Sequence, residues 1–378
     1  MGDDELTDIS HGDMEAADVA ALFDRHRLRI ARQLRGLTQV QLARSTGSVT
    51  AASLSQFENG HTRPSVATLR RLAVALRVPL GFFATPAHAP YDEEAAGFFR
   101  SLRSTLPRDR QRALAYVHLA RELALELERR VVLPDLLLPR PAQPITEHAT
   151  REEIERLARD TRREWNIPTG PIKDVVRTLE RHGVVTTRFR IELEKVDAFS
   201  VPFPDRPIVA LGADKGLRDR SRFDAAHELG HLVMHQPNQA GSKIIETQAH
   251  QFAAAFLMPE TDIRNELPPT VDWVGLLRLK TKWHVSIAAL LRRAYTLDVM
   301  SDRTYTQACK AMSVRGWRKH EPGDLGLPEK PVLLRRAVAL ATEKGMPLSE
   351  LAHQAGLPQQ DINVILGEGG DNRPRVRL

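Results

Sequence analysis

The sequence predicts a mainly α-helical protein with a small β-sheet, an α+β fold divided into more than one domain. Apolar residues recur at helical spacing along most of the 378 residues. Two runs are strand-like, because β-branched residues crowd "VVTTRFRI" and "RPIVALG". A Pro-rich stretch, "LPDLLLPRPAQPIT" (133–146), separates helical patterns and is typical of an extended linker. The length suffices for two or three domains.

The composition argues against several classes of protein. No apolar run reaches the roughly 18 residues that indicate a membrane span. The first 18 residues are acidic and polar, unlike a secretory leader, and we expect a disordered tail there (1–18). Cys309 is the single cysteine, so an internal disulfide is impossible and a cytoplasmic location is expected. Any metal site must therefore be built from histidines and carboxylates.

Residues 20–85 are expected to form a compact basic domain of several short helices. This segment has ten arginines against Asp24 and Glu58, a local excess of +8, whereas the whole chain carries +6. Such a concentration suits a phosphate backbone. An arginine-rich solvated surface is the alternative interpretation.

Two helices joined by a short turn are predicted inside this domain, in "LTQVQLARSTGSVTAASLSQFENG" (37–60). Gly47 ends the first helix, and the second begins at about Thr50. In this arrangement the start of the second helix faces the major groove. We expect Gln39, at the start of the first helix, and Arg63 to contact phosphates. The residues expected to face the groove are Thr50, Ala51, Ala52, Ser53 and Gln56.

The segment "LRIARQLRGLTQVQLARSTG…LSQFENGHTRPSVATLRRLAVALRVPLGFF" resembles the lambda-repressor-like, XRE-type DNA-binding domain over its full length. The resemblance implies a five-helix fold, a double-stranded DNA operator as partner, and a homodimer. One departure is "GSVTAAS", which is slightly longer than the commonest spacing and can shift the groove residues by one. A bundle that makes only protein contacts is the alternative.

A connector is predicted over residues 95–146. It begins with a long amphipathic helical pattern in which Pro107 marks a turn or a helix start, and it ends with the Pro-rich linker. The main domain boundary is expected at the linker or slightly before it.

A second domain is predicted over residues 150–300. Two helices fill 150–182, the two strand-like runs follow, and helices cover 242–259 and the part from 271 to 311. Between the strands and residue 242 lies another helical pattern, which ends in "RFDAAHELGHLVMH" (222–235).

This last motif is the strongest chemical signal in the chain. His227 and His231 are four residues apart, so one helix face presents both imidazoles to a single ion. Glu228 lies beside them, where a carboxylate can take a proton from metal-activated water. A helix with three structurally satisfied histidines is the alternative.

A zinc site also needs a third protein ligand, and spacing offers Glu246, His235 and His250. His235 follows His231 without a turn, and we interpret it as a capping or packing residue. Glu246 begins a helix whose alanines permit close packing against the histidine helix. Glu246 is therefore the favoured third ligand.

"RSRFDAAHELGHLVMH" followed by "IETQAHQFAAAFLMP" resembles the ImmA/IrrE family of metallopeptidases, and the resemblance covers about 150–295. It implies Zn²⁺ as cofactor, with Mn²⁺ as an alternative, held by His227, His231 and Glu246, with Glu228 as the catalytic acid/base. Members of that family cleave XRE-type repressors, so such a repressor is the implied protein substrate. Family members usually have Asn where this chain has His250, a candidate to orient Glu246 or to pack.

Two further hypotheses concern the strands and the C-terminal part. The run "RPIVALG" is expected to pair with an extended substrate, as edge strands do. Residues 301–378 are expected to form a helical module in which Leu351, Ala352, Leu357 and Ile362 are core residues. A second DNA-reading helix around Gly356, a dimerisation role and a sensing role are the alternatives.

Together these observations predict a bacterial DNA-binding regulator that carries a zinc endopeptidase. The peptidase would cleave a repressor-type protein in trans or its own chain, with the Pro-rich linker as one target. The rival prediction is a transcription factor whose second domain senses a ligand or a metal and does not cleave.

Overall fold

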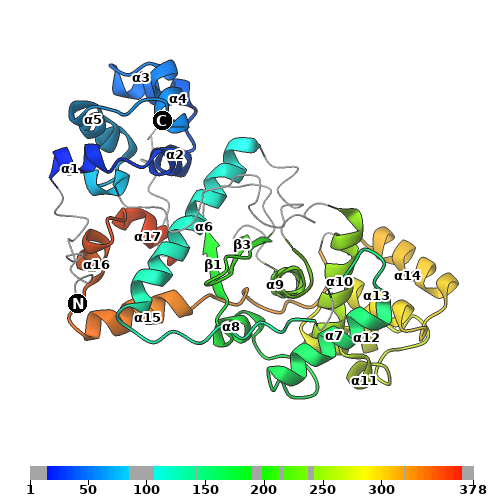
Figure 1. Ribbon diagram of the computed structural model, residues 1–378. Helices are drawn as coiled ribbons and strands as arrows, with labels where there is room; N and C mark the ends of the chain where they lie inside the picture. Colours follow the sequence, from blue (N-terminus) through cyan, green and yellow to red (C-terminus); the bar gives the residue numbers. More distant parts are fainter. Residues whose placement is uncertain are drawn as a thin grey trace, which may run out of the picture.

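The computed structural model of the chain describes residues 15–84, 106–141, 144–189, 198–212, 217–236, 242–318 and 320–367 (Figure 1). The predicted α+β class is confirmed, because helices dominate and one three-stranded sheet is present. Most of the predicted tail, residues 1–14, and part of the connector, residues 95–105, lie outside the described residues. No helix within the described ranges is both long enough and apolar enough to span a membrane.

Six short helices form the N-terminal domain, and local signals define their ends. Thr38 begins the third helix with a capping box, since its hydroxyl accepts from Gln41 N and the Gln41 side chain accepts from Thr38 N. Gly47 ends that helix with a φ of 67°, a left-handed conformation that favours glycine. The helices are α1 (Ala16–Ala21), α2 (Arg25–Leu34), α3 (Gln39–Thr46), α4 (Ala51–Asn59), α5 (Val66–Leu76) and the 3₁₀ helix η1 (Leu80–Phe83).

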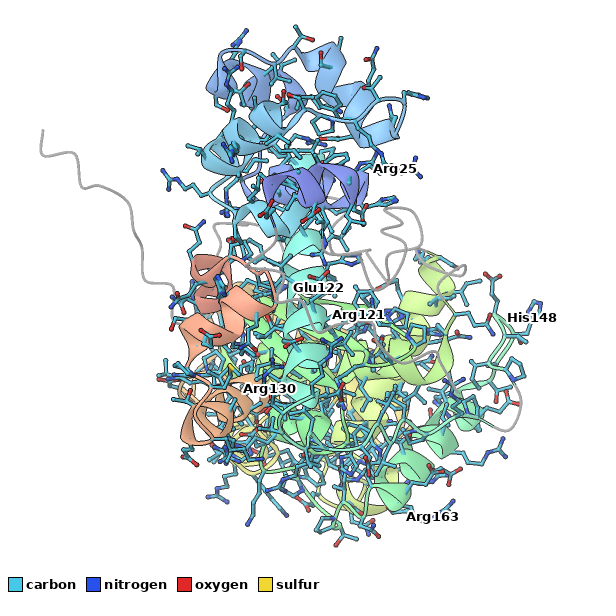
Figure 2. All side chains as sticks on the ribbon, turned by 60° about the vertical axis from the view of Figure 1, so that its left-hand side comes forward. Arg25, Arg121, Glu122, Arg130, His148 and Arg163 are labelled. Atoms are coloured by element: carbon cyan, nitrogen blue, oxygen red, sulfur yellow. The ribbon has the colours of Figure 1, made fainter. Side chains whose placement is uncertain are left out.

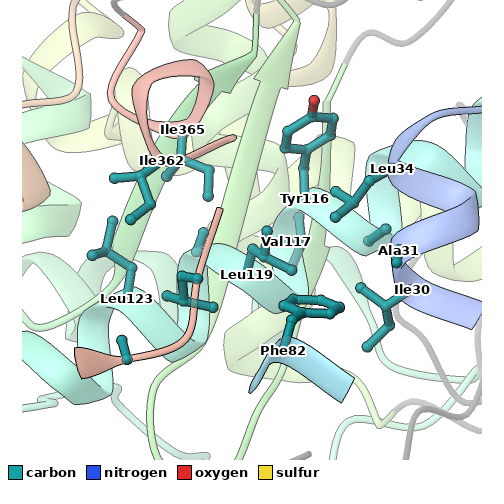
Figure 3. Close-up of a cluster of buried hydrophobic side chains, with 14 of the residues drawn as sticks. Ile30, Ala31, Leu34, Phe82, Tyr116, Val117, Leu119, Leu123, Ile362 and Ile365 are labelled. Carbon is teal, nitrogen blue, oxygen red and sulfur yellow. The ribbon is translucent and has the colours of Figure 1, made fainter. Parts of the chain in front are cut away.

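A long helix, α6 (Pro107–Glu128), connects the N-terminal domain to the rest of the molecule. Pro107 is its first residue, as predicted, because proline costs nothing at a position whose N–H has no helical partner. Figure 3 shows the α6 side chains Tyr116, Val117 and Leu119 between residues of α2 and the C-terminal residues Ile362 and Ile365. One continuous apolar core therefore joins the N-terminal domain, α6 and the C-terminal module.

Consecutive residues of α6 form ion pairs with both of its neighbours. Glu122 accepts from the buried Arg27 of α2 at 2.6 Å. Arg121 binds Asp205, between two strands of the sheet, with a shortest distance of 2.8 Å. Figure 2 shows both side chains on the central part of α6, below the N-terminal domain. This part of the predicted connector is thus a packed joint between the N-terminal domain and the sheet.

Part of the arginine excess in the N-terminal domain serves folding rather than an external phosphate. Arg27 pairs with Glu122, Arg32 binds Glu58 at 2.6 Å, and Arg35 pairs with a C-terminal aspartate. The remaining arginines supply whatever positive surface this domain offers to DNA.

The sheet has the strand order β1-β3-β2, with β1 (Val185–Phe189), β2 (Ala198–Val201) and β3 (Ile208–Gly212). β3 pairs in parallel with β1, Val185 opposite Ile208, and antiparallel with β2, Ala198 opposite Leu211. The hypothesis that "RPIVALG" pairs with a substrate is therefore wrong, because β3 is the central strand and is paired on both sides. The edge next to it is β2, a four-residue strand that was not predicted.

Both faces of the sheet are covered, which explains why its strands are almost wholly buried. Ile208 and Ala210 pack into the core with α6, whereas Val209 and Leu211 pack into a second core below the other face. That second core is formed with α7 (Arg151–Glu164), α8 (Val175–Arg181), α9 (Arg218–Met234), α10 (Lys243–Leu257), α11 (Glu260–Ile263), α12 (Trp273–Trp283), α13 (Ile287–Thr296) and α14 (Asp302–Val314).

The Pro-rich segment is extended but lies tightly against the second domain. Trp165 Nε1 donates to Leu137 O at 2.7 Å, and Leu137 N donates to His182 O at 3.1 Å. Gly183 has a φ of 81°, and a Cβ there would lie 2.5 Å from Asp135 O, so the backbones meet closely. The segment is a bound strap rather than a free tether.

The C-terminal module consists of α15 (Leu333–Glu343), α16 (Leu348–Gln354) and α17 (Gln359–Ile365). Its predicted core residues are confirmed, since Leu351, Ala352, Leu357 and Ile362 are all buried. α17 packs against α6 and β1, and the alternative of a second DNA-reading helix stays a prediction. Figure 1 shows this module beside α6, below the N-terminal domain.

Stability of the joint should depend on pH through His118, a buried residue of α6 packed on Phe203. Burial, together with the nearby charges of Arg121 and Arg27, lowers the pKa of His118 to about 3. The unfolded chain, with a pKa near 6.5, takes up a proton below that value while the folded chain does not. Stability is therefore full above pH 6.5 and is lost as the pH falls towards 3.

Between pH 7 and pH 5 this single group should lower the free energy of unfolding by about 2 kcal/mol. Urea denaturation of the wild type and of His118→Gln at both pH values measures the effect. The variant is expected to lose about 2 kcal/mol less on acidification. Equal losses in both proteins would contradict a neutral, buried His118.

Candidate metal centre and nucleic-acid interface

Helices α9 and α10 pack side by side and bring the predicted metal ligands together. Gly230, inside the "HELGH" motif, allows this approach, because a Cβ at that position would lie only 3.0 Å from the Phe252 ring. Ala249 and Ala253 of α10 are buried in the same contact region. The small residues that the sequence places on both helices therefore have a packing reason.

His227, His231 and Glu246 converge at this contact. Their candidate ligand atoms all lie within 4.8 Å of one another. The His227 Nε2 and His231 Nε2 atoms are 3.1 Å apart, and the nearest Glu246 oxygens lie 3.3 and 3.6 Å from them. Two imidazole nitrogens and one carboxylate oxygen form a donor set that suits Zn²⁺ and leaves a further coordination position open.

The pKa values of the two imidazoles are shifted in opposite directions. Burial alone would lower the pKa of His227, but the carboxylates of Glu246 and Glu228 raise it above its usual value. Burial, together with the neighbouring histidines, lowers the pKa of His231 well below its usual value. His231 is therefore neutral at pH 7, as a metal-binding imidazole must be.

A chain of hydrogen bonds runs from His231 away from the ligand cluster. His231 Nδ1 lies 3.0 Å from His235 Nδ1, and His235 Nε2 lies 3.1 Å from Gln248 Oε1. Gln248 Nε2 donates to Thr146 O at 2.8 Å. With His231 Nε2 directed at the ligand cluster, one consistent set of donors follows: His231 Nδ1–H to His235, His235 Nε2–H to Gln248, and Gln248 to Thr146.

His235 is thus not one of the converging ligands, in agreement with the sequence interpretation, and it also ends α9 as the C-cap residue. Its contact with His231 and the part played by Gln248 were missed. No local signal marks Gln248, because its partners lie 13 and 102 residues away along the chain.

Glu228 lies on the side of α9 that faces the sheet, where Ser200 Oγ donates to Glu228 Oε2 at 2.7 Å. Ser200 and Ala198 share one face of β2, while Phe199 and Val201 point into the opposite core. Burial raises the pKa of the Glu228 carboxyl to about 7, although His227 and Ser200 act to lower it. Ser200 was not predicted, since nothing in "DAFSV" marks a serine that meets α9.

His250 is exposed and lies outside the cluster of ligand atoms. Its Nδ1 is 2.8 Å from the backbone oxygen of Glu246, and its ring packs edge-on against His227 with centroids 4.4 Å apart. His250 thus contacts two of the predicted ligand residues, and its role in orienting Glu246 stays a prediction.

A cavity of about 900 Å³ opens beside the cluster. Its lining includes Glu246 and His250 of α10, Phe223 and Asp224 of α9, and residues of α13 and of the segment after α14. The ligand cluster is therefore reached from a space wide enough for a chain segment or a small molecule.

The predicted DNA-contacting residues lie on and around α3 and α4. Ala52 and Gln56 are exposed on α4, whereas Ala51 is half-buried. Thr50 and Ser53 cap the start of α4, with Ser53 N donating to Thr50 Oγ1 at 3.0 Å.

The two predicted phosphate contacts already have partners inside the protein. Gln39 Nε2 donates to Glu58 Oε2 at 3.0 Å, and Arg63 Nη1 donates to Ala21 O at 2.6 Å. Glu58 is itself bound by Arg32, so the Gln39 side chain is held in a defined orientation at the start of α3. Both contacts with DNA stay predictions.

Fold and site together define a helix-turn-helix domain joined in one chain to a domain that presents a histidine–glutamate cluster on two packed helices. A family model described as "Helix-turn-helix" matches residues 28–83. A peptidase M78 model described as "IrrE N-terminal-like domain" matches residues 179–295. Both resemblances inferred from the sequence are confirmed by these matches.

One curated relative is similar to part of the chain. A region of 101 residues is 34% identical to the HTH-type transcriptional regulator SutR of Escherichia coli (strain K12). The region covers 26% of this chain and 54% of that protein, so the chain spans about half the length of this relative.

Proposed function

We propose that the protein is a DNA-binding transcriptional regulator that carries a zinc-dependent endopeptidase, and that the peptidase cleaves a repressor-type protein. The observation that carries this proposal is the buried Glu228 carboxylate, held by Ser200 next to three converging ligand residues. A metal site with a purely structural role needs no such carboxylate.

His227, His231 and Glu246 would hold the ion, and the hydrogen-bonded chain behind His231 would keep its Nε2 free to bind. When bound, zinc supplies Lewis-acid chemistry, which polarises a carbonyl and makes a water molecule more acidic. Ser200 binds Glu228 Oε2, and Glu228 Oε1 is left to accept the proton of that water and return it to the leaving amine. β2, the strand that supplies Ser200, is the edge at which an extended substrate would pair.

Cleavage in trans is favoured over cleavage of the chain's own Pro-rich segment. That segment is bound through Leu137 to Trp165 and His182, and Arg206 Nη1 donates to Pro134 O at 3.0 Å. A scissile bond must be extended and free to enter a site, so this strap would first have to detach from the second domain. A separate repressor-type protein is the simpler substrate.

The N-terminal domain would bring this activity to DNA as a dimer. The start of α4, with Thr50, Ala51, Ala52, Ser53 and Gln56, would read the major groove, while Gln39 and Arg63 would contact phosphates. This part of the proposal is supported by the exposed positions of Ala52 and Gln56 and by the orientation that Glu58 imposes on Gln39.

The test of the whole proposal is terminal-peptide profiling of cells that express the wild type or Glu228→Gln, with and without stress. Operator binding of both purified proteins is measured in parallel. A non-cleaving sensor is the rival, and it predicts identical protein termini in both strains.

Metal affinity should depend on Gln248, although Gln248 is not a ligand. Gln248→Met removes the acceptor of His235 Nε2 and leaves His231 less firmly oriented, so zinc affinity is expected to fall by about tenfold or more. Competition with a chromophoric chelator measures it, with circular dichroism as a check on folding. Thr247→Ala is the matched control, because Thr247 is exposed and its hydroxyl donates to Lys243 O of its own helix. Equal zinc affinity in both variants would contradict the orienting role.

A further inference from the structure

The charged side chains that line the 900 Å³ cavity beside the ligand cluster differ in whether they form ion pairs within the protein. Three of its carboxylates are paired with cations of the same wall. Glu155 forms a buried ion pair with Arg293. Lys280 binds Asp219 at 3.3 Å and Glu321 at 3.0 Å. These five groups are paired with one another and together carry one net negative charge.

Three cations on the cavity wall lie outside these ion pairs. Lys243 is the first residue of α10, Arg292 lies on α13, and Arg318 follows α14, so three separate elements supply them. All three side chains are exposed, and none forms an ion pair with a carboxylate of the described residues. Arg292 is held against Tyr295 and Tyr305, with its guanidinium 5.4 and 5.8 Å from the ring centroids, so its charge is presented in a fixed place.

The neighbourhood of these cations suits a polypeptide better than a nucleic acid. Phe223, Ala254 and Trp317 add apolar surface to the cavity, which peptide side chains can use. Asp224 and Glu246 line the end nearest the ligand cluster, and they would repel a continuous run of phosphates. A peptide carries charges only on its ionisable residues, so it can place an uncharged residue beside Asp224 and Glu246.

We propose that this cavity binds an acidic segment of a polypeptide substrate, and that Lys243, Arg292 and Arg318 select it by charge. The inference rests on the proposed peptidase function and adds the substrate class: the chain to be cleaved carries aspartate or glutamate on the side of the scissile bond that enters the cavity. Affinity should fall with added salt, because all three cations are solvent-accessible.

The test uses the full chain as Glu228→Gln, so that bound peptide is not consumed. Fluorescence anisotropy follows a labelled peptide of about twelve residues that alternates glutamate with alanine, and a matched peptide with glutamine in place of glutamate. The charge-reversed variant Lys243→Glu/Arg318→Glu is compared with Arg303→Glu/Lys310→Glu, whose exposed cations lie on α14 outside the cavity lining. Labelled oligothymidylate of similar length is the third probe.

We expect the glutamate peptide to bind about tenfold more tightly than the glutamine peptide at low salt, and the cavity variant to lose that margin while the control variant keeps it. Equal binding of the two peptides, or equal losses in both variants, overturns the inference. Oligothymidylate binding that disappears only in the cavity variant assigns the cavity to nucleic acid instead and also overturns it.

This binding readout separates the inference from the proposed function. Selective binding of the acidic peptide without any cleavage by the wild type in cells would refute the peptidase and leave the cavity as an acidic-peptide site. Cleavage in cells without charge-selective binding would refute the inference alone.

Discussion

New protein N-termini that appear in stressed cells expressing the wild type are expected to be missing in cells that express Glu228→Gln. The substitution keeps His227, His231 and Glu246 and changes one oxygen of the base into an amide that cannot accept the proton of water. Loss of a general base typically slows hydrolysis by about a hundredfold or more. Glutamine still accepts the Ser200 hydrogen bond through its carbonyl oxygen, so the packing between β2 and α9 is preserved.

Two controls make this result decisive. Zinc content of the purified variant should equal that of the wild type, since no ligand is changed. Gln56→Glu, on the exposed face of α4, is the reciprocal variant, because it should lose operator binding and keep cleavage. Termini that are identical in wild type and Glu228→Gln under every condition, with operator binding intact, would refute the peptidase in favour of the sensor.

Asp361→Ala is expected to lower the free energy of unfolding by about 3 kcal/mol or more, because it removes one partner of a buried ion pair. Asp361 is buried on α17, where it accepts from Arg35 at 2.8 and 2.6 Å and from the Tyr116 hydroxyl at 3.1 Å. Burial, with Asp361 beside it, raises the pKa of Tyr116 to about 12, so the phenol stays a donor. Removing the carboxylate leaves a guanidinium without its counter-charge at the point where α2, α6 and α17 meet.

Thermal or urea unfolding measures this loss, and hydrogen exchange locates it. Protection should fall in α2 and α17 and stay high in α9 and α10, which belong to the other core. Tyr116→Phe removes one neutral donor and should cost about 1 kcal/mol. Gln360→Ala, next to Asp361, removes one exposed hydrogen bond to Arg77 O and should cost less than about 1 kcal/mol. Equal free energies of unfolding for Asp361→Ala and Gln360→Ala would contradict the stabilising role of Asp361.

Local sequence signals predicted most helices correctly, because those signals act within a few residues. The capping box of Thr38 and Gln41, the left-handed Gly47 and the first-turn Pro107 each determine a helix end without help from the rest of the chain. β2 was missed for the opposite reason. Its four residues are buried on both faces and show no alternation of polar and apolar side chains, so only the pairing with β3 makes them a strand.

The sequence by itself determined the parts of the site that depend on helical spacing: His227 and His231 four residues apart, Glu228 between them, and Glu246 at the start of the next helix. It also determined the pairing of a helix-turn-helix segment with a peptidase-type segment, since both follow from short motifs. Helix periodicity converts such spacing directly into a shared face.

Only the tertiary structure decided which groups surround that site and how the domains are joined. Ser200 meets Glu228 across 28 residues, Gln248 meets Thr146 across 102, and Arg35 meets Asp361 across 326. No local pattern encodes such partners, because any buried carboxylate can pair with any arginine that the fold brings within reach. Burial forces each of these polar groups to find a partner, and packing alone selects which one.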